Sequence, residues 1–179
     1  MDQGRVTVSY ARALLQWANE NSVEEEVYEQ SAYFVNLLNN PDFAQLLTSP
    51  MINASKRAKT IEAVVSKATP KLARFVSLVH KNNREKQLTG MMLSFQKLYR
   101  EQKGIIRTRV ESPTELSPSS KNGIKQFIGN SFKKEVELEF SFNPSLIGGF
   151  VLTIEDNMLD KSVKGELEKL RKQLMGIVQ

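Results

Sequence analysis

The sequence contains no cysteine and only one histidine, His80, among its 179 residues. Without cysteine the chain can form neither a disulfide framework nor a thiolate nucleophile, which is in keeping with a reducing compartment. His80 has no cysteine to share a metal with and no carboxylate four residues away on either side. The residues that build most catalytic metal sites are therefore absent, and we expect no metal centre.

Long apolar runs and phosphate-binding glycine motifs are also missing. No apolar run approaches the ~18 residues that a membrane-spanning helix needs, and the amino terminus lacks the charged start and apolar core of a signal peptide. We therefore expect no direct membrane span and a membrane contact only through partners. Neither G-x-x-x-x-G-K nor G-x-G-x-x-G occurs, so we expect no nucleotide cofactor, and indeed no cofactor.

Charge is distributed unevenly, although the formal net charge is a modest +5. Residues 53–104 carry 12 basic and 3 acidic residues, whereas residues 1–52 carry 2 basic and 7 acidic. A basic segment can be a nucleic-acid footprint, so an RNA-associated α/β binding module is kept as the alternative function. These basic residues are spread out and lack the strand aromatics and G-x-x-G loop of RNA-binding modules. We favour solvated helix faces and expect no nucleic-acid partner.

The first 104 residues show the periodicity of short amphipathic helices. Six are predicted: they begin near Thr7, at Ser22 with Glu25 as its capping-box partner, at Pro41, at Asn53, at Thr69-Pro70 and near Leu88. The sixth has its apolar residues on one stripe, and Gly104 ends it. Six short helices with short loops predict a bundle over residues 1–104.

After Gly104 the period changes from 3.6 to 2. Alternation predicts strands at residues 106–110 and 135–142, a compact apolar run predicts another at 146–154, and helices are expected near 121–132 and after Ser162. We expect Ile124, Phe127, Ile128 and Phe132 to point inward and the last two strands to be antiparallel neighbours. The fold class is thus α+β: the bundle followed by a small β-α-β-β-α domain with a mixed sheet, residues 105–179.

Residues 143–170 contain a strand, a polar turn and a capped helix. Two adjacent glycines, Gly148 and Gly149, predict a bulge or a close backbone approach. Asp156 and Asp160 could be imagined as an acid/base pair. We favour a turn at Asp156, with Asp160 helping Ser162 to cap the final helix.

Two helices have apolar faces that are wider than one core contact requires. At 100° per residue, Tyr10, Ala13, Leu14 and Trp17 form one stripe of the first helix, and Val8, Ala11, Leu15 and Ala18 form another. The fifth helix is similarly wide, with an apolar face of Leu72, Phe75, Val76, Leu78 and Val79. Either both helices are central in the bundle, or a groove between them accepts an amphipathic partner helix.

Two motifs carry a resemblance to a known family. Near the amino terminus stands Tyr10-Ala11-Arg12-Ala13-Leu14 with Ala18, and near the carboxyl terminus stand Leu146-Ile147-Gly148-Gly149-Phe150 and Asp160-Lys161-Ser162-Val163-Lys164-Gly165-Glu166-Leu167. Together they make the chain resemble, from end to end, the delta subunit of bacterial F-type ATP synthase, the family of the oligomycin sensitivity-conferring protein. One departure is Glu111-Ser112-Pro113-Thr114-Glu115-Leu116, where members carry a small residue and a proline-leucine pair.

The resemblance implies a non-catalytic stator subunit that links the alpha/beta catalytic head to the peripheral stalk. It implies that the amino-terminal helix of an alpha subunit is held between the first and fifth helices, in a groove of Tyr10, Ala13, Leu14, Trp17, Leu72, Phe75, Val76 and Val79. The C-terminal domain would meet the ends of the b subunits, and the family motif there comprises Gly148, Gly149, Asp156, Asp160, Ser162, Gly165 and Leu167. The lack of a transit peptide favours a bacterial member at the cytoplasmic face of the inner membrane. A third possibility, an esterase-like enzyme with His80 as base, has little support because His80 lies mid-helix among apolar neighbours.

Overall fold

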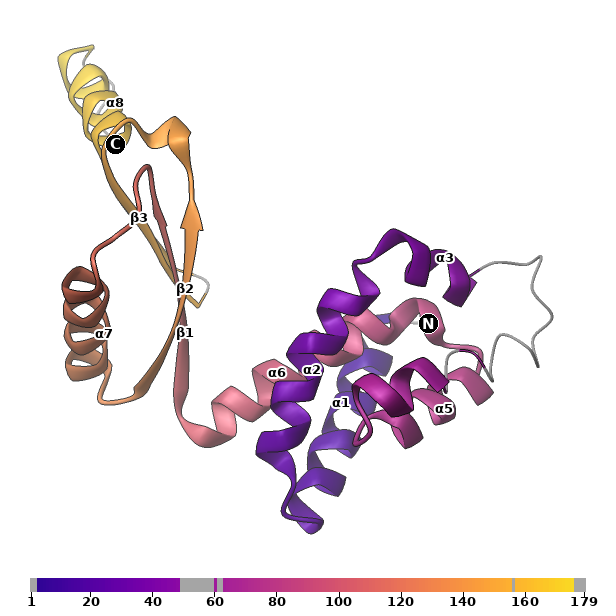
Figure 1. Cartoon of the computed structure of the whole chain (residues 1–179). Helices are drawn as coiled ribbons and strands as arrows, with labels where there is room; N and C mark the ends of the chain where they lie inside the picture. The colour runs from indigo at the N-terminus through magenta and orange to yellow at the C-terminus, as the bar shows by residue number, and fades with distance from the viewer. Residues whose placement is uncertain (1–2, 49–59, 61–62, 156, 176–179) are drawn as a thin grey trace. The chain divides into compact units, whose positions relative to one another are not determined.

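The computed structural model describes residues 3–48, 60, 63–155 and 157–175 of the chain. They form two compact units, Met1–Tyr99 and Arg100–Gln179, called here the N-terminal and C-terminal units (Figure 1). The first is helical and the second contains a sheet, so the predicted α+β class is confirmed.

The N-terminal unit is built from amphipathic helices that enclose one apolar core. Their bounds are α1 Gln3–Glu20, α2 Glu24–Leu38, α3 Pro41–Thr48, α5 Ala73–Lys81 and α6 Leu88–Lys103, whose last turn belongs to the second unit, with a 3₁₀ turn η1 at Glu85–Gln87. Residues 63–68 are also helical. The stripe predicted on α6 is buried at Leu88, Met91, Met92, Phe95 and Tyr99. Burying each large side chain of this kind contributes roughly 1.5–3 kcal/mol, so this stripe is a major source of the unit's stability.

Two predicted helix starts are wrong. Ser22 has φ +55° and does not cap α2, which begins two residues later with three glutamates in its first turn. Carboxylates there interact favourably with the positive end of the helix dipole, which takes the place of a side-chain cap. The Thr69 hydroxyl donates to the carbonyl of Val65 at 3.2 Å, residues 70–72 form a turn, and α5 begins at Ala73. The predicted cap Asn53 lies outside the described residues, so the count of six helices stays a prediction.

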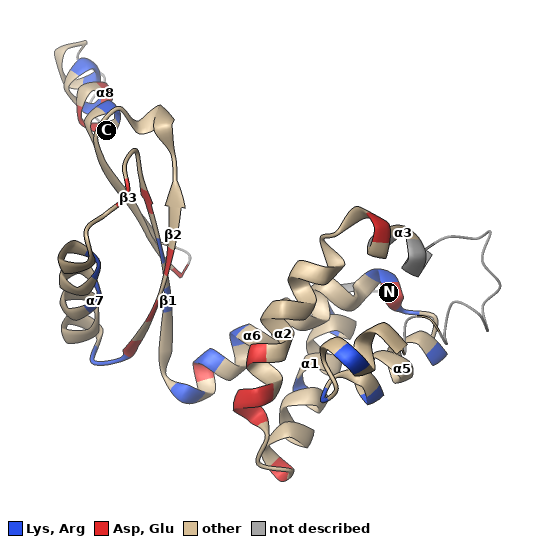
Figure 2. Ribbon diagram, in the orientation of Figure 1, with Lys and Arg blue, Asp and Glu red and all other residues tan. Residues whose placement is uncertain are grey.

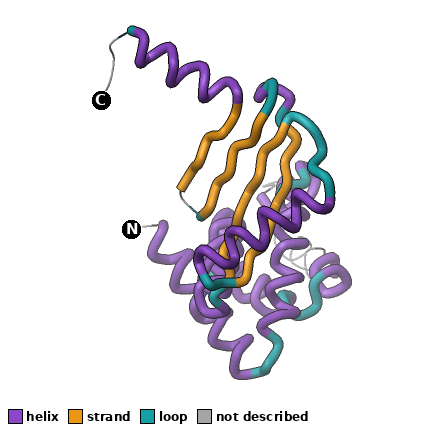
Figure 3. Tube along the Cα trace, turned by 90° about the vertical axis from the view of Figure 1, so that its left-hand side faces the viewer, coloured by secondary structure: helices purple, strands orange, loops and turns teal. Residues whose placement is uncertain are grey.

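The C-terminal unit is a four-stranded mixed sheet with the order β2-β1-β3-β4. Its elements are β1 Ile105–Ser112, α7 Pro118–Phe132, β2 Glu135–Phe142, a 3₁₀ turn η2 Pro144–Leu146, β3 Gly149–Ile154, β4 Asn157–Ser162 and α8 Val163–Leu174. Strands β1 and β2 are parallel, whereas β3 is antiparallel to both β1 and β4. Two parallel strands need a crossover connection, and α7 provides it while lying across one face of the sheet (Figure 3).

The sheet corrects three expectations. Strands β2 and β3 are not neighbours, because β1 lies between them and pairs with both. The polar turn predicted after β3 is followed by an additional edge strand, β4. Most of its residues are exposed, so buried and exposed side chains do not alternate along it. On α7 only Ile128 is buried; Ile124 is half-buried, and Phe127 and Phe132 are exposed.

The two faces of the sheet differ in character. Val110, Val136 and Leu152 pack with Ile128 of α7 on the covered face. On the other face, the guanidinium groups of Arg107 and Arg109 lie 2.7 and 3.4 Å from the Glu139 carboxylate. Partial burial works to raise the pKa of Glu139, but the hydrogen bond and charge of Arg107, with a further contribution from Arg109, outweigh it and lower the pKa. The core of the unit is therefore on the α7 side.

The helical fragment 1–104 should fold alone, since the N-terminal core is built from helices only. It includes the whole of α6 and ends at Gly104, whose φ of +68° suits the residue after a helix. Circular dichroism of the fragment should show a cooperative helical melt. A gradual melt without a transition would show that the helices need the sheet.

Candidate functional site

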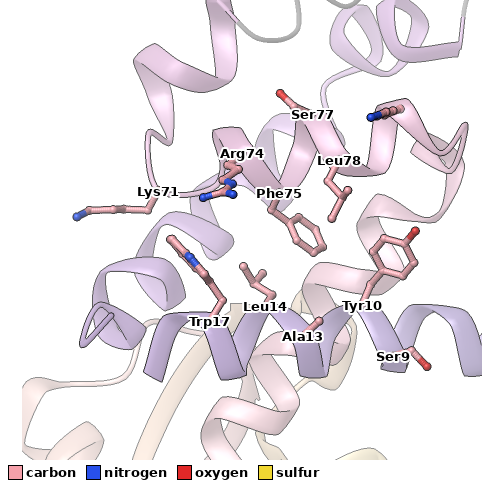
Figure 4. A pocket seen from close by; sticks show the side chains of 11 residues that line it. Ser9, Tyr10, Ala13, Leu14, Trp17, Lys71, Arg74, Phe75, Ser77 and Leu78 are labelled. Atoms are coloured by element: carbon pink, nitrogen blue, oxygen red, sulfur yellow. The ribbon is translucent and has the colours of Figure 1, made fainter. Parts of the chain in front are cut away.

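An open groove of about 740 Å³ lies between α1 and α5 (Figure 4). Helix α1 contributes Ser9, Tyr10, Ala13, Leu14 and Trp17, and the segment of α5 together with the turn before it contributes Lys71, Arg74, Phe75, Ser77, Leu78 and Lys81. Most of the exposed lining is apolar. A concave apolar surface between two helices of a bundle is a common kind of binding site.

Helix α1 lines the groove because it has two apolar faces with different environments. Ala11, Leu14 and Ala18 are buried, and the two alanines leave room for close packing in the core. Ala13 is exposed, and Tyr10 and Trp17 are only half-buried. The predicted stripe of Tyr10, Ala13, Leu14 and Trp17 is therefore a groove wall, with Leu14 belonging to both the groove and the core.

Tyr10 is held in place by three contacts at the edge of the groove. Its hydroxyl accepts a hydrogen bond from the Asn82 side-chain amide at 2.9 Å. Its ring meets Phe75 edge-on, with ring centroids 6.3 Å apart, and the Arg84 guanidinium carbon lies 5.4 Å from its ring centroid. Because these contacts come from α5 and the segment after it, they fix the separation of the two walls before any ligand binds.

Five of the eight predicted groove residues line the groove: Tyr10, Ala13, Leu14, Trp17 and Phe75. Leu72, Val76 and Val79 do not line it, because they are buried in the core on the inner side of α5. The predicted groove set includes too much of α5 and leaves out Leu78, although the sequence pattern places Leu78 on the wide apolar face of this helix. Leu78 is 51% exposed and lines the α5 side of the groove. The wide apolar face of α5 was consistent with a groove, but it did not show which edge of α5 faces that groove.

The C-terminal motif residues form a compact turn around the start of α8. The Ser162 hydroxyl accepts from the Gly165 N–H at 3.0 Å, so Ser162 caps α8 as predicted. Asp160 Oδ1 accepts from the Ser162 N–H at 2.8 Å. Hydrogen bonds from the Ser162 side chain and backbone lower the pKa of Asp160. A Cβ at Gly165 would lie 2.5 Å from Asp160 Oδ2, which explains the glycine there.

The glycine pair connects β3 to this turn. Gly149 has φ +77°, and a Cβ there would overlap the carbonyl oxygen of Lys161 on β4. The carbonyl of Gly148 accepts from the Val163 N–H at 3.0 Å, and a Cβ at Gly148 would lie 3.1 Å from the Val163 side chain. The predicted close approach of backbone is therefore present. Asp156 lies outside the described residues, and Leu167 is exposed on α8.

An exposed apolar surface surrounds this turn. Val163, Leu167, Leu170 and Leu174 share one side of α8, and all are exposed. Ile147 is 76% exposed, with φ +63° and ψ −43°, and the Gly148 N–H donates to the Leu146 carbonyl at 2.6 Å. This is a γ-turn with a β-branched residue at its centre, a strained arrangement that holds Ile147 outward. Ile147 together with Val163, Leu167, Leu170 and Leu174 is called here the α8 surface.

Neither surface presents a reacting group. His80, near the end of α5, contacts the carboxylate of Glu85 in the 3₁₀ turn η1. Across the described part of the chain, no three histidine, cysteine, aspartate or glutamate side chains are grouped closely enough to hold a metal. Within the same residues, no helix combines the length and apolar character needed to cross a bilayer.

The fold and these two surfaces define a class: a protein with a helical unit and a sheet unit that acts by binding other proteins. The family model described as "ATP synthase delta (OSCP) subunit" matches residues 6–174. The chain belongs to this family, and the resemblance predicted from the two sequence motifs is confirmed.

Named relatives agree with the family model over nearly the whole chain. An ATP synthase subunit delta of Prochlorococcus marinus (strain MIT 9301) is 34% identical over 168 residues, 92% of this chain and 93% of the relative. One of Phocaeicola vulgatus is 31% identical over 175 residues, 96% and 95% of the two chains. A chain in a cryo-electron microscopy structure of the Toxoplasma gondii mitochondrial ATP synthase hexamer has a TM-score of 0.75 at 19% identity, over 98% of both chains, a likeness of fold.

Membership settles the general role. The chain is a non-catalytic stator subunit of the F-type ATP synthase, with other subunits of that complex as its partners, and it is peripheral to the membrane part of the complex. The esterase alternative is excluded by the family.

Gly149→Ala should lower the free energy of unfolding by about 1–3 kcal/mol, because the residue has positive φ and its Cβ would overlap the β4 backbone. The matched control is Gly123→Ala, where nothing lies within 4 Å of the new Cβ on α7. That variant should be neutral or slightly stabilising because alanine is the better helix former. Urea melts measure both; equal stabilities for the two variants would show that the glycine pair is not required.

Asp160→Asn should lower the melting temperature at pH 7. The pKa of Asp160 is depressed in the folded state, so its stabilising contribution is present above the ordinary value of 3.8 and is lost as pH falls through the lower folded value. The difference between variant and parent should therefore stay constant from pH 7 to about pH 5 and narrow as thermal melts are taken below about pH 4. The exposed carboxylate variant Glu168→Gln is the control. A gap that stayed constant with pH would contradict the assignment.

Proposed function

We propose that this subunit holds the catalytic head still by gripping the amino-terminal helix of an alpha subunit in the groove between α1 and α5. The observation that carries the proposal is the groove itself: it is open, its floor of Leu14 and Phe75 is apolar, and its walls are fixed by internal contacts. An amphipathic helix binds such a groove by inserting side chains at i, i+3, i+4 and i+7.

Apolar contacts suit the mechanical task. A stator has to resist the torque of the rotor, and exposed ion pairs contribute only about 0–1 kcal/mol each. Burying one leucine or phenylalanine side chain contributes about 1.5–3 kcal/mol, so a few anchors on Ala13, Trp17 and Leu78 would supply most of the affinity. The Tyr10 contacts favour a groove that is formed in advance, which reduces the cost of binding.

The α8 surface is proposed as the contact with the carboxyl-terminal ends of the b subunits. Its apolar residues on α8 follow one another at spacings of four, three and four, the repeat by which helices pack side by side. Helix α8 runs away from the sheet in both views (Figures 1 and 3), and among the described elements it contacts the adjoining strand β4 most closely. Its apolar side chains are exposed. The turn built by Asp160, Ser162 and Gly165 would fix the direction in which α8 points.

The two ATP synthase delta subunits named above come from bacteria, which supports a place at the cytoplasmic face of a bacterial inner membrane. The alternative of an RNA-binding module has less support, because the family model and the named relatives are ATP synthase delta subunits. The groove combines cations with the aromatic side chains of Tyr10, Trp17 and Phe75, so competition between RNA and a helical peptide separates the two functions.

A peptide with the sequence of the alpha subunit's amino-terminal helix should change the fluorescence of Trp17 saturably, since this is the only tryptophan and it lines the groove. Most of the binding free energy should remain in about 1 M salt, where the Debye length is ~3 Å, because the apolar contacts are not screened. A signal that did not saturate would argue against the groove.

Leu78→Asp and Tyr10→Ala should each weaken the peptide at least about tenfold, because an apolar anchor is lost. Both variants should keep a cooperative thermal melt. Leu93→Asp is the matched control, since Leu93 is similarly exposed on α6 outside the groove. Val79→Asp, by contrast, buries a charge in the core and should unfold the unit. Unchanged affinity in Leu78→Asp would place the alpha helix elsewhere.

A further inference from the structure

The two walls of the groove differ in charge. Three cations, Lys71, Arg74 and Lys81, line the α5 side, and no carboxylate is among the lining residues. The α1 side consists of Ser9, Tyr10, Ala13, Leu14 and Trp17 and carries no charge. The basic residues stand out on α5 in Figure 2, and Figure 4 shows Arg74 directed into the space above Trp17 and Leu14.

Two of the three cations are available to a ligand. The ammonium of Lys71 lies 3.3 Å from the Glu26 carboxylate, so its charge is already paired. Arg74 and Lys81 form no ion pair with any residue that the structure describes. An occupant that brought no carboxylate would leave these two charges along its flank without compensation.

The two available cations have a defined spacing. Arg74, Leu78 and Lys81 stand at i, i+4 and i+7, so they share one side of α5. Two helical turns separate Arg74 from Lys81, ~10.5 Å along the axis. A partner helix lying along α5 would reach both with residues that are also two turns apart, while Leu78 contacts its apolar side.

We propose that the groove selects a helix whose edge towards α5 carries two carboxylates seven residues apart beside its apolar face. The inference rests on the proposed helix-binding function and specifies the partner's chemistry: Arg74 and Lys81 are its specificity-determining residues. A carboxylate pair on one edge also fixes the direction of the helix, because turning it end for end would move that edge to the uncharged α1 wall. The apolar floor supplies affinity, and the cations select the partner and its orientation.

Three synthetic helical peptides test this against the full chain. All share one apolar face, and at the two edge positions they carry glutamate, glutamine or lysine. Binding is followed by Trp17 fluorescence. The glutamate peptide should bind about three- to thirtyfold tighter than the glutamine peptide, the effect of two exposed ion pairs, and this advantage should disappear in high salt.

Charge reversal provides the specificity test. In Arg74→Glu and Lys81→Glu the preference should shift towards the lysine peptide, whereas binding of the glutamine peptide should change little. Lys97→Glu on α6 makes the same change in net charge away from the groove and should keep the parent's preference.

The outcomes separate the two levels of the proposal. Equal binding of the glutamate and glutamine peptides would overturn the acidic-edge inference and leave the helix-binding function standing. Failure of every peptide, including the alpha-subunit sequence, to change the fluorescence of a folded chain would overturn the helix-binding function itself. Displacement of the glutamate peptide by oligouridylate at lower concentration would show that the cations serve RNA and would also overturn the inference.

Discussion

The placement of α1 beside α5 is the arrangement on which the groove depends. The buried stripe of Ala11, Leu14 and Ala18 seats α1 in the helical core, and the two alanines leave room for close packing there. This leaves the neighbouring stripe, with Tyr10 and Trp17, facing outward beside α5 rather than covered by another helix of the described chain. The tyrosine contacts then set the width of the groove. A single helix thus supplies core on one face and binding surface on the next.

The C-terminal unit exposes apolar side chains on a protruding helix, α8, whereas the N-terminal unit exposes them in a groove. Gly149 allows β3 to approach β4 closely, and Asp160 and Ser162 then begin α8 directly at the end of β4. Because the first turn of α8 is tied to the sheet by its cap and by the Gly148–Val163 hydrogen bond, the rest of the helix can extend with its apolar side uncovered. Both units therefore expose apolar surface from rigid supports, as a part under torque requires.

Sequence periodicity predicted the helices and strands better than it predicted which of them pack or pair with one another. The stripe on α6, the helix end at Gly104 and the cap at Ser162 depend on local chemistry, and the structure confirms them. The placement of β3 beside β1 depends on long-range pairing that neighbouring residues do not encode. Strand β4 was not predicted, because an exposed edge strand need not show alternating apolar and polar residues. The two stripes on α1 predicted either a central position in the bundle or a groove. Val76 and Val79 were assigned to the groove, but they are buried in the core, because the angle around a helix does not reveal which neighbour occupies each side. The basic wall was visible only as scattered lysines and arginines until the fold brought Arg74 and Lys81 onto one side of α5.

The most direct test of the account uses the absence of cysteine. A single Ala13→Cys substitution places one thiol in the groove, because the chain has none of its own. The substituted subunit, assembled into the ATP synthase in native membranes and treated with a short thiol-to-amine cross-linker, should form a product with an alpha subunit. The α8 substitution Leu167→Cys, treated in the same way, should instead give a product with b. An Ala13→Cys product with b, or none with alpha while the Leu167→Cys product forms, would contradict the claim that the groove between α1 and α5 holds the catalytic head.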